Sequence, residues 1–411
     1  MIKKGFALTA LKFETRPFRL LNKIQHYAWG ARNEQAFIAK LLQLEVEKDK
    51  PYAELWMGTH PNAPSTVEIN NQEKIHLDRF IKQFPREVLG AKVIERFGAQ
   101  LPFLFKVLSA GEALSIQAHP NKEQAAILHK RDPEHYPDDN HKPEIAIALD
   151  QLTALVGFRP LTELITILEE FPELNQIRFF AKNQDKPFTN RQEFKLFFQD
   201  LMRNSEKHPE ILEQILQSME QKLLSRSNLS ERDELYLQLR KRYGTDVGLI
   251  FIYLLNLVHL SRGQGVFLKA GVPHAYLKGN IVECMANSDN VVRVGLTPKF
   301  KDVQALMEIV TYDLKPVEIL DGSQSNQFTY QVPINEFAIQ HFDLEPGQKA
   351  HFKFDSISIL IIINGQGRIS YRTGSQVGQK GQSFLLPAAL SEVNFKALTP
   401  MEIFCAFVPI K

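Results

Sequence analysis

The hydrophobic periodicity of this chain changes twice along its length, and each change limits the folds available to it. Up to about residue 158, short apolar runs such as TVEIN and PFLFKVLSA alternate with turn residues, which is typical of β-strands. From Leu161 to Leu168 and beyond, apolar residues recur at helical spacing with charged residues between them. After Ser261, glycines, prolines and short strand-like runs return. The pattern predicts a mainly β chain interrupted by one helical block.

Two apolar stretches give more specific predictions. The longest apolar run, Val247 to Leu260, has fourteen residues, whereas a bilayer span needs about 20. It therefore predicts a buried helix, and no membrane partner is expected. Further along, ISILIII is followed by the turn NGQG and then by RISYR, which predicts a β-hairpin.

The two β regions share a local pattern. Gly265 is followed by VFLKAGVPHA, and Gly381 is followed by QSFLLPAAL. A glycine, an apolar strand and a proline-marked turn are typical of a strand in a small barrel, so two similar barrels are expected. The first repeat keeps His274 after its proline, while the second has Ala388 and Ala389 there. A metal is therefore expected in the first barrel alone.

Length and charge exclude some classes of protein. The 411 residues exceed the roughly 250 to 300 at which one core stops growing, so at least two domains or lobes are expected. Forty-nine basic and forty-seven acidic residues leave a net charge of +2, and no basic run stands out. A nucleic-acid partner is therefore not expected.

The cysteines and the first residues bear on location. Cys284 and Cys405 lie in apolar surroundings without CxxC spacing, which favours a reducing cytoplasm. The basic start is followed by an apolar stretch that is soon broken by Lys12, Glu14 and Arg16, so no secretory signal is expected.

Polar residues inside two apolar runs are candidate ligands. In LSIQAHPNK, Gln117 and His119 lie two residues apart and would project from the same side of a strand. In NHKPEIAIAL, Glu144 opens a strand-like run. Taken singly, each is more often a satisfied polar residue of a half-buried strand or a solvent-facing carboxylate. With His274 they would supply an amide oxygen, two imidazole nitrogens and a carboxylate, which suits zinc or a similar divalent ion.

Five long motifs, in the same order, resemble those of the type I phosphomannose isomerases. They are QHYAWG, AELWMGTHPNAPS, LPFLFKVLSAGEALSIQAHPNK, NHKPEIAIAL and GVFLKAGVPHAYLKGNIVECMANSDNVVRVGLTPK. The resemblance extends from about Lys12 to the C-terminus. It implies a mainly β (α+β) architecture of two cupin-type barrels, the first of them metal-binding, with a helical insertion. The expected boundaries are an N-terminal extension at 1–12, a catalytic barrel from 13–158 and 261–320, the insertion at 159–260 and a C-terminal barrel without metal at 321–411.

The resemblance also implies a cofactor and a reaction. One zinc ion (Zn2+) per chain would be held by four residues that match the family's ligands: Gln117, His119, Glu144 and His274. The implied reaction interconverts mannose 6-phosphate and fructose 6-phosphate through a cis-enediol. We further expect a cytoplasmic monomer whose product enters GDP-mannose biosynthesis, with this sugar phosphate as its small-molecule partner.

Such a reaction needs partners for the enediolate charge and a base that reaches two carbons on one face. Arg293 matches the family's active-site arginine, and strand alternation can aim it into the barrel. For the base, three candidates have similar weight: Glu283, Lys142, and the pair of His141 with Asp289.

Phosphate recognition requires cations and hydroxyl or backbone donors, because no GxxxxGK[ST] loop occurs. The residues favoured for it are Ser115, Lys106 and Lys299. Glu54 is expected to line the pocket, while Trp29 and Trp56 are expected to be packing residues.

Two other classes of function are alternatives for a cupin with these ligands. A non-haem iron oxygenase would use two histidines and one carboxylate, but that set lacks a glutamine. A non-catalytic sugar-phosphate binder would bind mannose 6-phosphate without producing fructose 6-phosphate. The role of the helical insertion is left open by its sequence.

Overall fold

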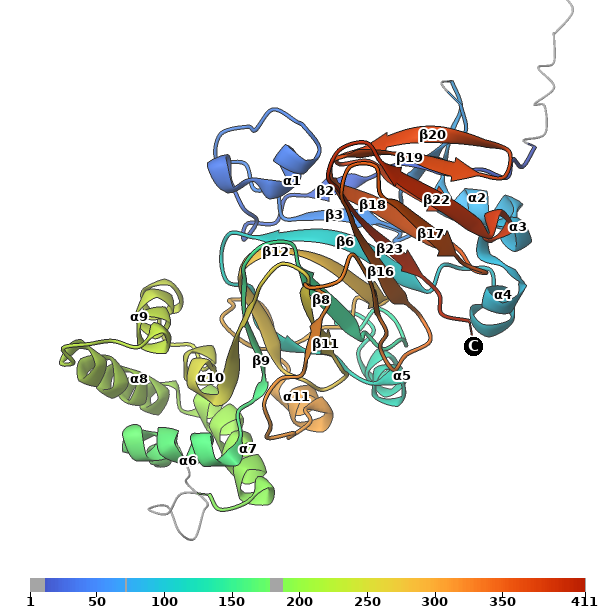
Figure 1. Ribbon diagram of the computed structural model, residues 1–411. Coiled ribbons are helices and arrows are strands. Elements are labelled where there is room, and N and C mark those ends of the chain that lie inside the picture. The colour runs from blue at the N-terminus through green and yellow to red at the C-terminus, as the bar shows by residue number, and fades with distance from the viewer. Residues whose placement is uncertain (1–11, 71, 178–187, 411) are drawn as a thin grey trace, which may run out of the picture. The chain divides into compact units, whose positions relative to one another are not determined.

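The computed structural model describes residues 12–70, 72–177 and 188–410. The chain divides into two compact units (Figure 1). One contains residues up to Lys23, Met57–Pro102 and the chain from Asn326 onward, and the other contains Ile24–Trp56 and Phe103–Ser325. The expected N-terminal extension, 1–12, lies outside the described residues except for Lys12.

The unit that contains Phe103–Ser325 is built on an eleven-stranded sheet. Its strands are β2 (Lys23–Gln25), β3 (Glu54–Met57), β6 (Phe103–Ala110), β7 (Ile116–Ala118), β8 (Glu144–Ala148), β9 (Leu152–Phe158), β10 (Leu255–Leu260), β11 (Gln264–Leu268), β12 (His274–Ala286), β13 (Val292–Gly295) and β14 (Ile319–Asp321). The main path runs β14-β11-β8-β12-β6-β3-β2, while β7, β9, β10 and β13 form a second set that joins it through β12. Among strands β6 to β14, all of these pairings are antiparallel.

Strand β12 connects the two sets because it bends in its middle. Its first residues, from His274, pair with β7 and β9, and its last residues, to Ala286, pair with β6 and β8. Gly279 lies at the bend with φ +131°, where a Cβ would come within 2.4 Å of the Gln151 carbonyl oxygen. A side chain is therefore excluded at this corner.

One face of this sheet carries small residues. Ala146 of β8 lies directly opposite Glu283 of β12, and Glu283 lies directly opposite Lys106 of β6. Side chains directly opposite one another project to the same face, so Lys106 and Glu283 share a face with the alanines of EIAIA. Small neighbours leave room there for long polar side chains.

Among its described residues this unit has eight α-helices, most of which bury one face, as expected, while the last helix of the middle block is buried on every side. They are α1 (Phe37–Leu41), α5 (Lys122–Arg131), α6 (Leu161–Glu170), α7 (Arg191–Lys207), α8 (Pro209–Leu224), α9 (Glu231–Tyr243), α10 (Gly248–Leu254) and α11 (Val303–Ile309), with short 3-10 turns at Asn33–Gln35 and Pro172–Ile177. Helices α6 to α10 gather at one end of the unit (Figure 1) and bury their apolar faces in a common core. The start of α9 is set by a capping box between Ser230 and Asp233.

The helix predicted for Val247–Leu260 is wrong in its last six residues. Helix α10 ends at Leu254, and Leu255–Leu260 form β10, which pairs with β9. In LNLVHL the first, fourth and last residues are buried while His259 is exposed. The composition of Leu255–Leu260 also suits a helix, but these residues form a strand because they pair with the edge of β9.

The other unit contains two sheets. The eight-stranded sheet has the order β15-β16-β23-β18-β21-β1-β4-β5, and the four-stranded sheet has the order β17-β22-β19-β20. Its strands are β1 (Phe18–Leu21), β4 (Thr66–Glu68), β5 (Lys74–His76), β15 (Gln327–Tyr330), β16 (Ala338–Leu344), β17 (Lys349–Lys353), β18 (Ser358–Asn364), β19 (Gln366–Tyr371), β20 (Gly374–Gln379), β21 (Ser383–Leu386), β22 (Glu392–Ala397) and β23 (Met401–Phe407). The core shared by these sheets contains Phe342, Phe352, Phe384 and Phe395 and is filled with apolar side chains.

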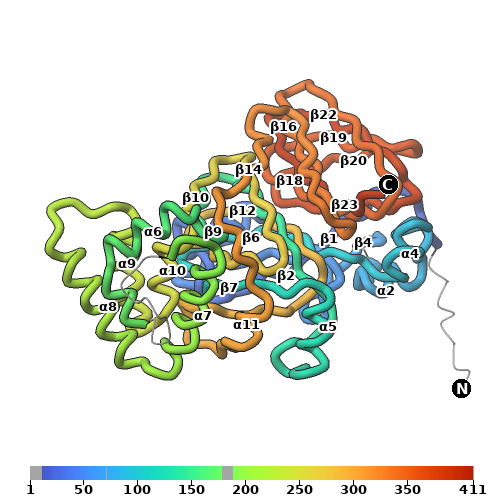
Figure 2. The backbone as a smooth tube through the Cα atoms, turned by 90° about the horizontal axis from the view of Figure 1, so that it is seen from below, coloured from blue at the N-terminus to red at the C-terminus, as the bar shows by residue number. Residues whose placement is uncertain are grey.

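Three short helices, α2 (Leu77–Gln83), α3 (Pro85–Leu89) and α4 (Ala91–Phe97), belong to the same unit. Helix α2 lies beside β4 (Figure 2). The segment at Ala388–Leu390, where the second repeat lacks a histidine, forms a 3-10 turn.

The predicted hairpin of ISILIII with RISYR is wrong. Strand β18 lies between β21 and β23 in the larger sheet, whereas β19 lies between β20 and β22 in the smaller one. Gly365 makes the corner with φ +75°, and a Cβ there would lie 1.9 Å from the Pro400 carbonyl oxygen. Because both edges of β18 are already paired, the chain passes to the other sheet.

Among the described residues, no helix combines the length and the apolar character that crossing a bilayer requires.

Candidate functional site

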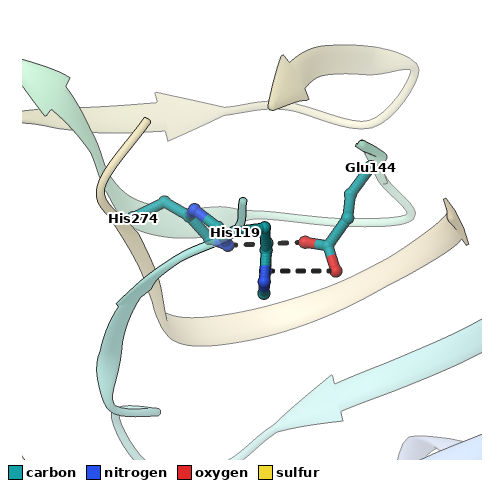
Figure 3. Close-up of side chains that lie close together, drawn as sticks. All are labelled: His119, Glu144 and His274. Atoms are coloured by element: carbon teal, nitrogen blue, oxygen red, sulfur yellow. Dashed lines mark ion pairs between the residues drawn. The ribbon is translucent and has the colours of Figure 1, made fainter. Parts of the chain in front are cut away.

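Three buried side chains converge inside the unit that contains β12. Figure 3 shows His119 and His274 pointing at the carboxylate of Glu144. The Nε2 atom of His119 lies 3.5 Å from Glu144 Oε1, and the Nε2 atom of His274 lies 3.4 Å from Glu144 Oε2. None of the three side chains is more than 2% exposed.

Hydrogen bonds to the backbone fix the tautomer of each imidazole. His119 Nδ1 lies 2.8 Å from the carbonyl oxygen of Asn290, and His274 Nδ1 lies 2.9 Å from that of Val272. A carbonyl oxygen only accepts, so each Nδ1 carries the proton in the neutral ring and each Nε2 presents a lone pair. Burial, followed by the charge of Lys142, lowers the pKa of His119 to about 4, which keeps its ring neutral at neutral pH.

Lone pairs therefore face lone pairs at the centre of the site. Both Nε2 atoms and Glu144 Oε2 are buried and have no hydrogen-bond partner. Burial alone would raise the pKa of Glu144, but opposing contributions, led by the charge of Lys142, hold that pKa well below its usual range. Unpaired buried acceptors are costly, and a cation between them removes the cost. The chemistry of this donor set fits a divalent metal such as zinc.

Gln117 is placed to complete this donor set. Its backbone is directly opposite His274 on one side and Arg293 on the other. Opposite residues in antiparallel strands project to the same face, so the amide of Gln117 lies on the face of His274. Within the described residues no hydrogen bond of this side chain is found, and the residue is half-buried.

A cavity of about 920 Å³ opens above this group. Eight of the residues expected in the site line it: Glu54, Lys106, Ser115, Gln117, Lys142, Asp289, Arg293 and Lys299. The histidines and Glu144 are buried rather than lining the cavity, as is Glu283, and His141 does not line it either. Gln117 and Lys142, which lies 3.3 Å from Glu144, connect the cavity with the buried group.

A buried cation forms one wall of the cavity. Lys106 Nζ lies 3.1 Å from Glu283 Oε2 and 3.8 Å from Glu54 Oε2. Burial would lower the pKa of Lys106, but the carboxylates of Glu54 and Glu283 outweigh it and raise that pKa. Burial raises the pKa of Glu283, which also accepts a hydrogen bond of 3.0 Å from the Tyr276 hydroxyl. Lys106 therefore remains charged.

Arg293 and Lys299 are cations of a different kind. Within the described residues, neither the guanidinium group of Arg293 nor the ammonium group of Lys299 has a carboxylate partner. Arg293 is half-buried on β13, and burial lowers its pKa. Lys299 is exposed at the rim, and the half-buried Ser115 also lines the cavity. A concave site with unpartnered cations can bind an anionic ligand.

Several residues of the site were not expected from the sequence. Asn290 holds His119 through its carbonyl oxygen, and Tyr276 donates to Glu283. The helical block contributes Arg242, Tyr243 and Asp246 to the cavity lining. A signal for the last group exists in RYGTD, where a glycine ends the predicted helix and is followed by polar residues.

A mainly β fold with a buried His–Glu–His group beneath a cavity is typical of a cupin-type protein with a candidate metal site. Two family models match: the catalytic domain of type I phosphomannose isomerase over residues 17–161, and the cupin domain of mannose-6-phosphate isomerase over residues 326–402. The expected cupin architecture is thereby confirmed.

Curated proteins and solved structures agree with the family models. The mannose-6-phosphate isomerase of Bos taurus is 38% identical over 94% of this chain and 97% of its own length. That of Rattus norvegicus is 41% identical over 85% of this chain and 88% of its own. A crystal structure of the Salmonella typhimurium enzyme, bound to its substrate f6p and zinc, superimposes with a TM-score of 0.83 at 30% identity, covering 96% of this chain and all of that one. The chain belongs to the type I phosphomannose isomerases, and it is an enzyme of the aldose–ketose isomerase class.

Proposed function

We propose that this chain interconverts mannose 6-phosphate and fructose 6-phosphate with one zinc ion per chain. The observation that carries the proposal is the convergence of two unprotonated, unpartnered Nε2 atoms on the Glu144 carboxylate beneath a cavity with unpartnered cations. The relatives named above, one of them bound to zinc and f6p, support the choice of metal and substrate.

Four residues would hold the zinc ion: Gln117, His119, Glu144 and His274. When bound, zinc would orient and polarise the oxygens of the open-chain sugar. Glu144 is the one anionic ligand, so a positive charge would remain at the centre. The hydrogen bonds from each Nδ1 to a backbone carbonyl oxygen orient the rings and fix the lone pair on each Nε2.

Lys106 and Arg293 stabilise the negative charge that develops on the enediolate oxygens. Lys106 stays protonated because two carboxylates raise its pKa, so it donates a hydrogen bond and does not accept a proton. Arg293 adds a planar, permanently charged group from β13, on the face of Gln117.

Proton transfer between C2 and C1 requires a group that reaches the cavity on one face of the substrate. Lys142 and Asp289 line the cavity, whereas Glu283 contacts it through Lys106. We therefore assign the transfer to Lys142 or to the pair of His141 with Asp289. In this assignment Glu283 maintains the charge of Lys106.

The phosphate group is recognised at the rim. Lys299 supplies a cation without a carboxylate partner, and Ser115 supplies a hydroxyl. Lys106 is already paired with two carboxylates, so its charge is directed to the reacting oxygens. Glu54 lines the cavity and accepts a hydrogen bond from the indole of Trp56, which anchors it beside Lys106.

The other expectations remain proposals. They are the division into a catalytic barrel, a helical insertion and a C-terminal barrel with the boundaries given above, a monomeric state, a cytoplasmic location and a role in GDP-mannose biosynthesis. The buried free thiols of Cys284 and Cys405 support a reducing compartment.

The proposed function is tested by incubating the zinc-loaded chain with mannose 6-phosphate in deuterium oxide. Conversion to fructose 6-phosphate with deuterium at C1 is expected, because a proton removed from C2 by a side chain exchanges with solvent before its return. Binding of mannose 6-phosphate without any product would instead identify a non-catalytic binder. Oxygen consumption on reconstitution with Fe²⁺, without isomerisation, would identify an oxygenase.

A further inference from the structure

We propose that Asp246 of the helical block is a positioning residue for substrate binding. It fixes the turn Leu296–Lys301 at the rim of the cavity, so that the helical block holds Lys299 where the phosphate group binds. The inference rests on the function proposed above, and it gives the helical block a role in recognition in addition to packing.

Asp246 bridges the helical block and the turn. Its side chain is buried, and its Oδ1 atom accepts hydrogen bonds of 2.7 Å from the backbone N–H groups of Leu296 and Gly248. Its Oδ2 atom lies 3.5 Å from Lys301 Nζ. One carboxylate therefore holds both ends of the turn, at Leu296 and at Lys301.

The turn needs such an anchor because of its backbone conformation. Leu296 is buried and has φ +55°, a left-handed conformation that a side chain disfavours. Strained backbone persists only when the surroundings hold it in place. Loss of the Asp246 oxygen would leave the buried N–H of Leu296 unpaired and would let the turn relax.

Two glycines permit this contact. A Cβ on Gly248 would lie 2.6 Å from the nitrogen of Leu296 and 2.8 Å from Asp246 Oδ1. A Cβ on Gly295 would lie 2.5 Å from both Gly248 N and Asp246 Oδ1. The backbones at Gly248 and at Gly295 are therefore too close for a side chain to fit between them. The position of Leu296 thus depends directly on the start of α10.

The helical side of the bridge is itself fixed. Glu213 of α8 accepts two hydrogen bonds from the Arg240 guanidinium and a third from the Thr245 hydroxyl. Arg240 also donates to the Gly244 carbonyl oxygen over 2.6 Å. The residues just before Asp246 are therefore held by α8 and α9 and can transmit a fixed position to the turn.

The charges at the rim explain why the position of the turn matters. Lys301 faces Asp246, and Arg242 is paired with Glu112 at 2.6 Å. Within the described residues of this rim, Lys299 has no carboxylate partner. An anion at the rim thus depends on a cation carried by the turn, so displacement of the turn should weaken phosphate binding more than it slows the chemical step.

The test compares two substitutions at Asp246 in the full, zinc-loaded chain. In Asp246→Ala the acceptor is lost, and the KM for mannose 6-phosphate and the inhibition constant of inorganic phosphate should both rise about tenfold while kcat stays within about twofold. In Asp246→Asn the amide oxygen can still accept from Leu296 and Gly248, so both constants should stay within about threefold of the original chain. Unchanged constants in Asp246→Ala would overturn the proposal.

A second substitution and a control separate positioning from loss of folding. Gly248→Ala removes no polar group but forces α10 and Leu296 apart, so it should raise both the KM for mannose 6-phosphate and the inhibition constant of inorganic phosphate. If Asp246→Ala does not fold, the result for Gly248→Ala tests the proposal in its place. Asp233→Asn alters a buried carboxylate that accepts from Ser230 N and the Tyr253 hydroxyl, away from the cavity lining. Asp233→Asn should lower the free energy of unfolding without changing either constant. If both constants rose as much in Asp233→Asn as in Asp246→Ala, a specific role for Asp246 would be contradicted.

The same experiment distinguishes the two proposals from one another. If the original chain converts no mannose 6-phosphate, the proposed function fails, and calorimetric titration with inorganic phosphate still tests Asp246. Phosphate binding that weakens in Asp246→Ala and Gly248→Ala but not in Asp233→Asn supports the positioning role, and equal binding in all of them contradicts it.

Discussion

The ammonium group of Lys106 donates a hydrogen bond of 3.1 Å to a carboxylate oxygen of Glu283, and the two side chains are 7% and 4% exposed. Their backbones lie directly opposite one another on β6 and β12. The pair is thus set by strand register, and it places a cation in the cavity wall.

Breaking this pair should destabilise the protein strongly. Glu283→Gln leaves Lys106 with the more distant Glu54 as its carboxylate partner, and we expect a loss of about 3 kcal/mol in the free energy of unfolding. Lys106→Met alone should have a similar cost, because it leaves Glu283 buried without its cation. Denaturant unfolding of both single variants and the double variant measures the coupling.

The double variant should lose less stability than the sum of the single losses, by at least about 1 kcal/mol, because neither buried charge of the pair remains. Its turnover should still be lower by about 100-fold, because the donor to the substrate oxygens is absent. Strictly additive losses of stability would show that the two side chains do not interact.

Replacing Arg293 by lysine keeps the charge and removes the planar fork. If Arg293 stabilises the enediolate, Arg293→Lys should lower kcat by about 100-fold while zinc content and folding are unchanged. Steady-state kinetics with a metal count on each preparation measures this. Arg159→Lys, which alters an ion pair with Glu163 on the helical block, is the matched control and should keep its activity. Near-normal turnover in Arg293→Lys would exclude the proposed role.

Asn290 should control metal affinity without binding the metal. Its carbonyl oxygen accepts from His119 Nδ1, and its buried amide donates to Asp138 and to the Asn140 carbonyl oxygen. Asn290→Ala keeps the backbone carbonyl oxygen but removes the amide hydrogen bonds that hold it in place, so zinc affinity measured by competition with a chelator should fall about 10-fold to 100-fold.

At saturating zinc, Asn290→Ala should recover most of its turnover, because the four ligands remain. Asn204→Ala is the matched control, since Asn204 is a buried amide that donates to the Ile177 carbonyl oxygen on the helical block. An equal loss of zinc affinity in both variants would point to general loosening of the unit.

The ion pair of Glu213 with Arg240 should make the stability of the helical block depend on pH. Hydrogen bonds from Arg240 lower the pKa of Glu213 to about 2, against about 4.3 in an unfolded chain. Because the folded pKa is the lower one, the stabilisation is present above about pH 4.3 and is lost as the pH falls toward about 2.

The partial exposure of this pair limits its contribution to about 1 kcal/mol, because water and salt screen it. The difference in free energy of unfolding between the original chain and Glu213→Gln should therefore be constant above about pH 5 and shrink at lower pH. Arg240→Gln should give the same pH dependence. A difference that does not change with pH would mean that the pair adds nothing to stability.

Local patterns in the sequence predicted the strand and helix types well where one period dominates. The strands at EIAIA and PFLFKVLSA follow from short apolar runs bounded by turn residues, and the amphipathic helices of the middle block follow from 3.6-residue spacing. The end of α10 and the partner of β18 did not, because both depend on which strand edges are free after the sheets assemble.

The site shows the same division between local and long-range information. The alternation of Gln117 and His119 pointed to ligands, and the structure adds the register that places Gln117 between His274 and Arg293. No sequence period could indicate that Asp246, fifty positions before Leu296, accepts its backbone N–H. Contacts of this kind arise from the packing of helices on the sheet and leave no local signature.

The most direct test of the central claim is turnover of mannose 6-phosphate by one preparation, measured before chelation, after chelation and after zinc is restored, with the metal counted each time. Activity should be lost with the metal and regained at about one zinc per chain. The variant His274→Ala should bind no metal and show no activity, whereas His259→Ala, which changes an exposed histidine, should keep both. Full activity in the metal-free chain, or a zinc-loaded and folded chain without turnover, would contradict the central claim.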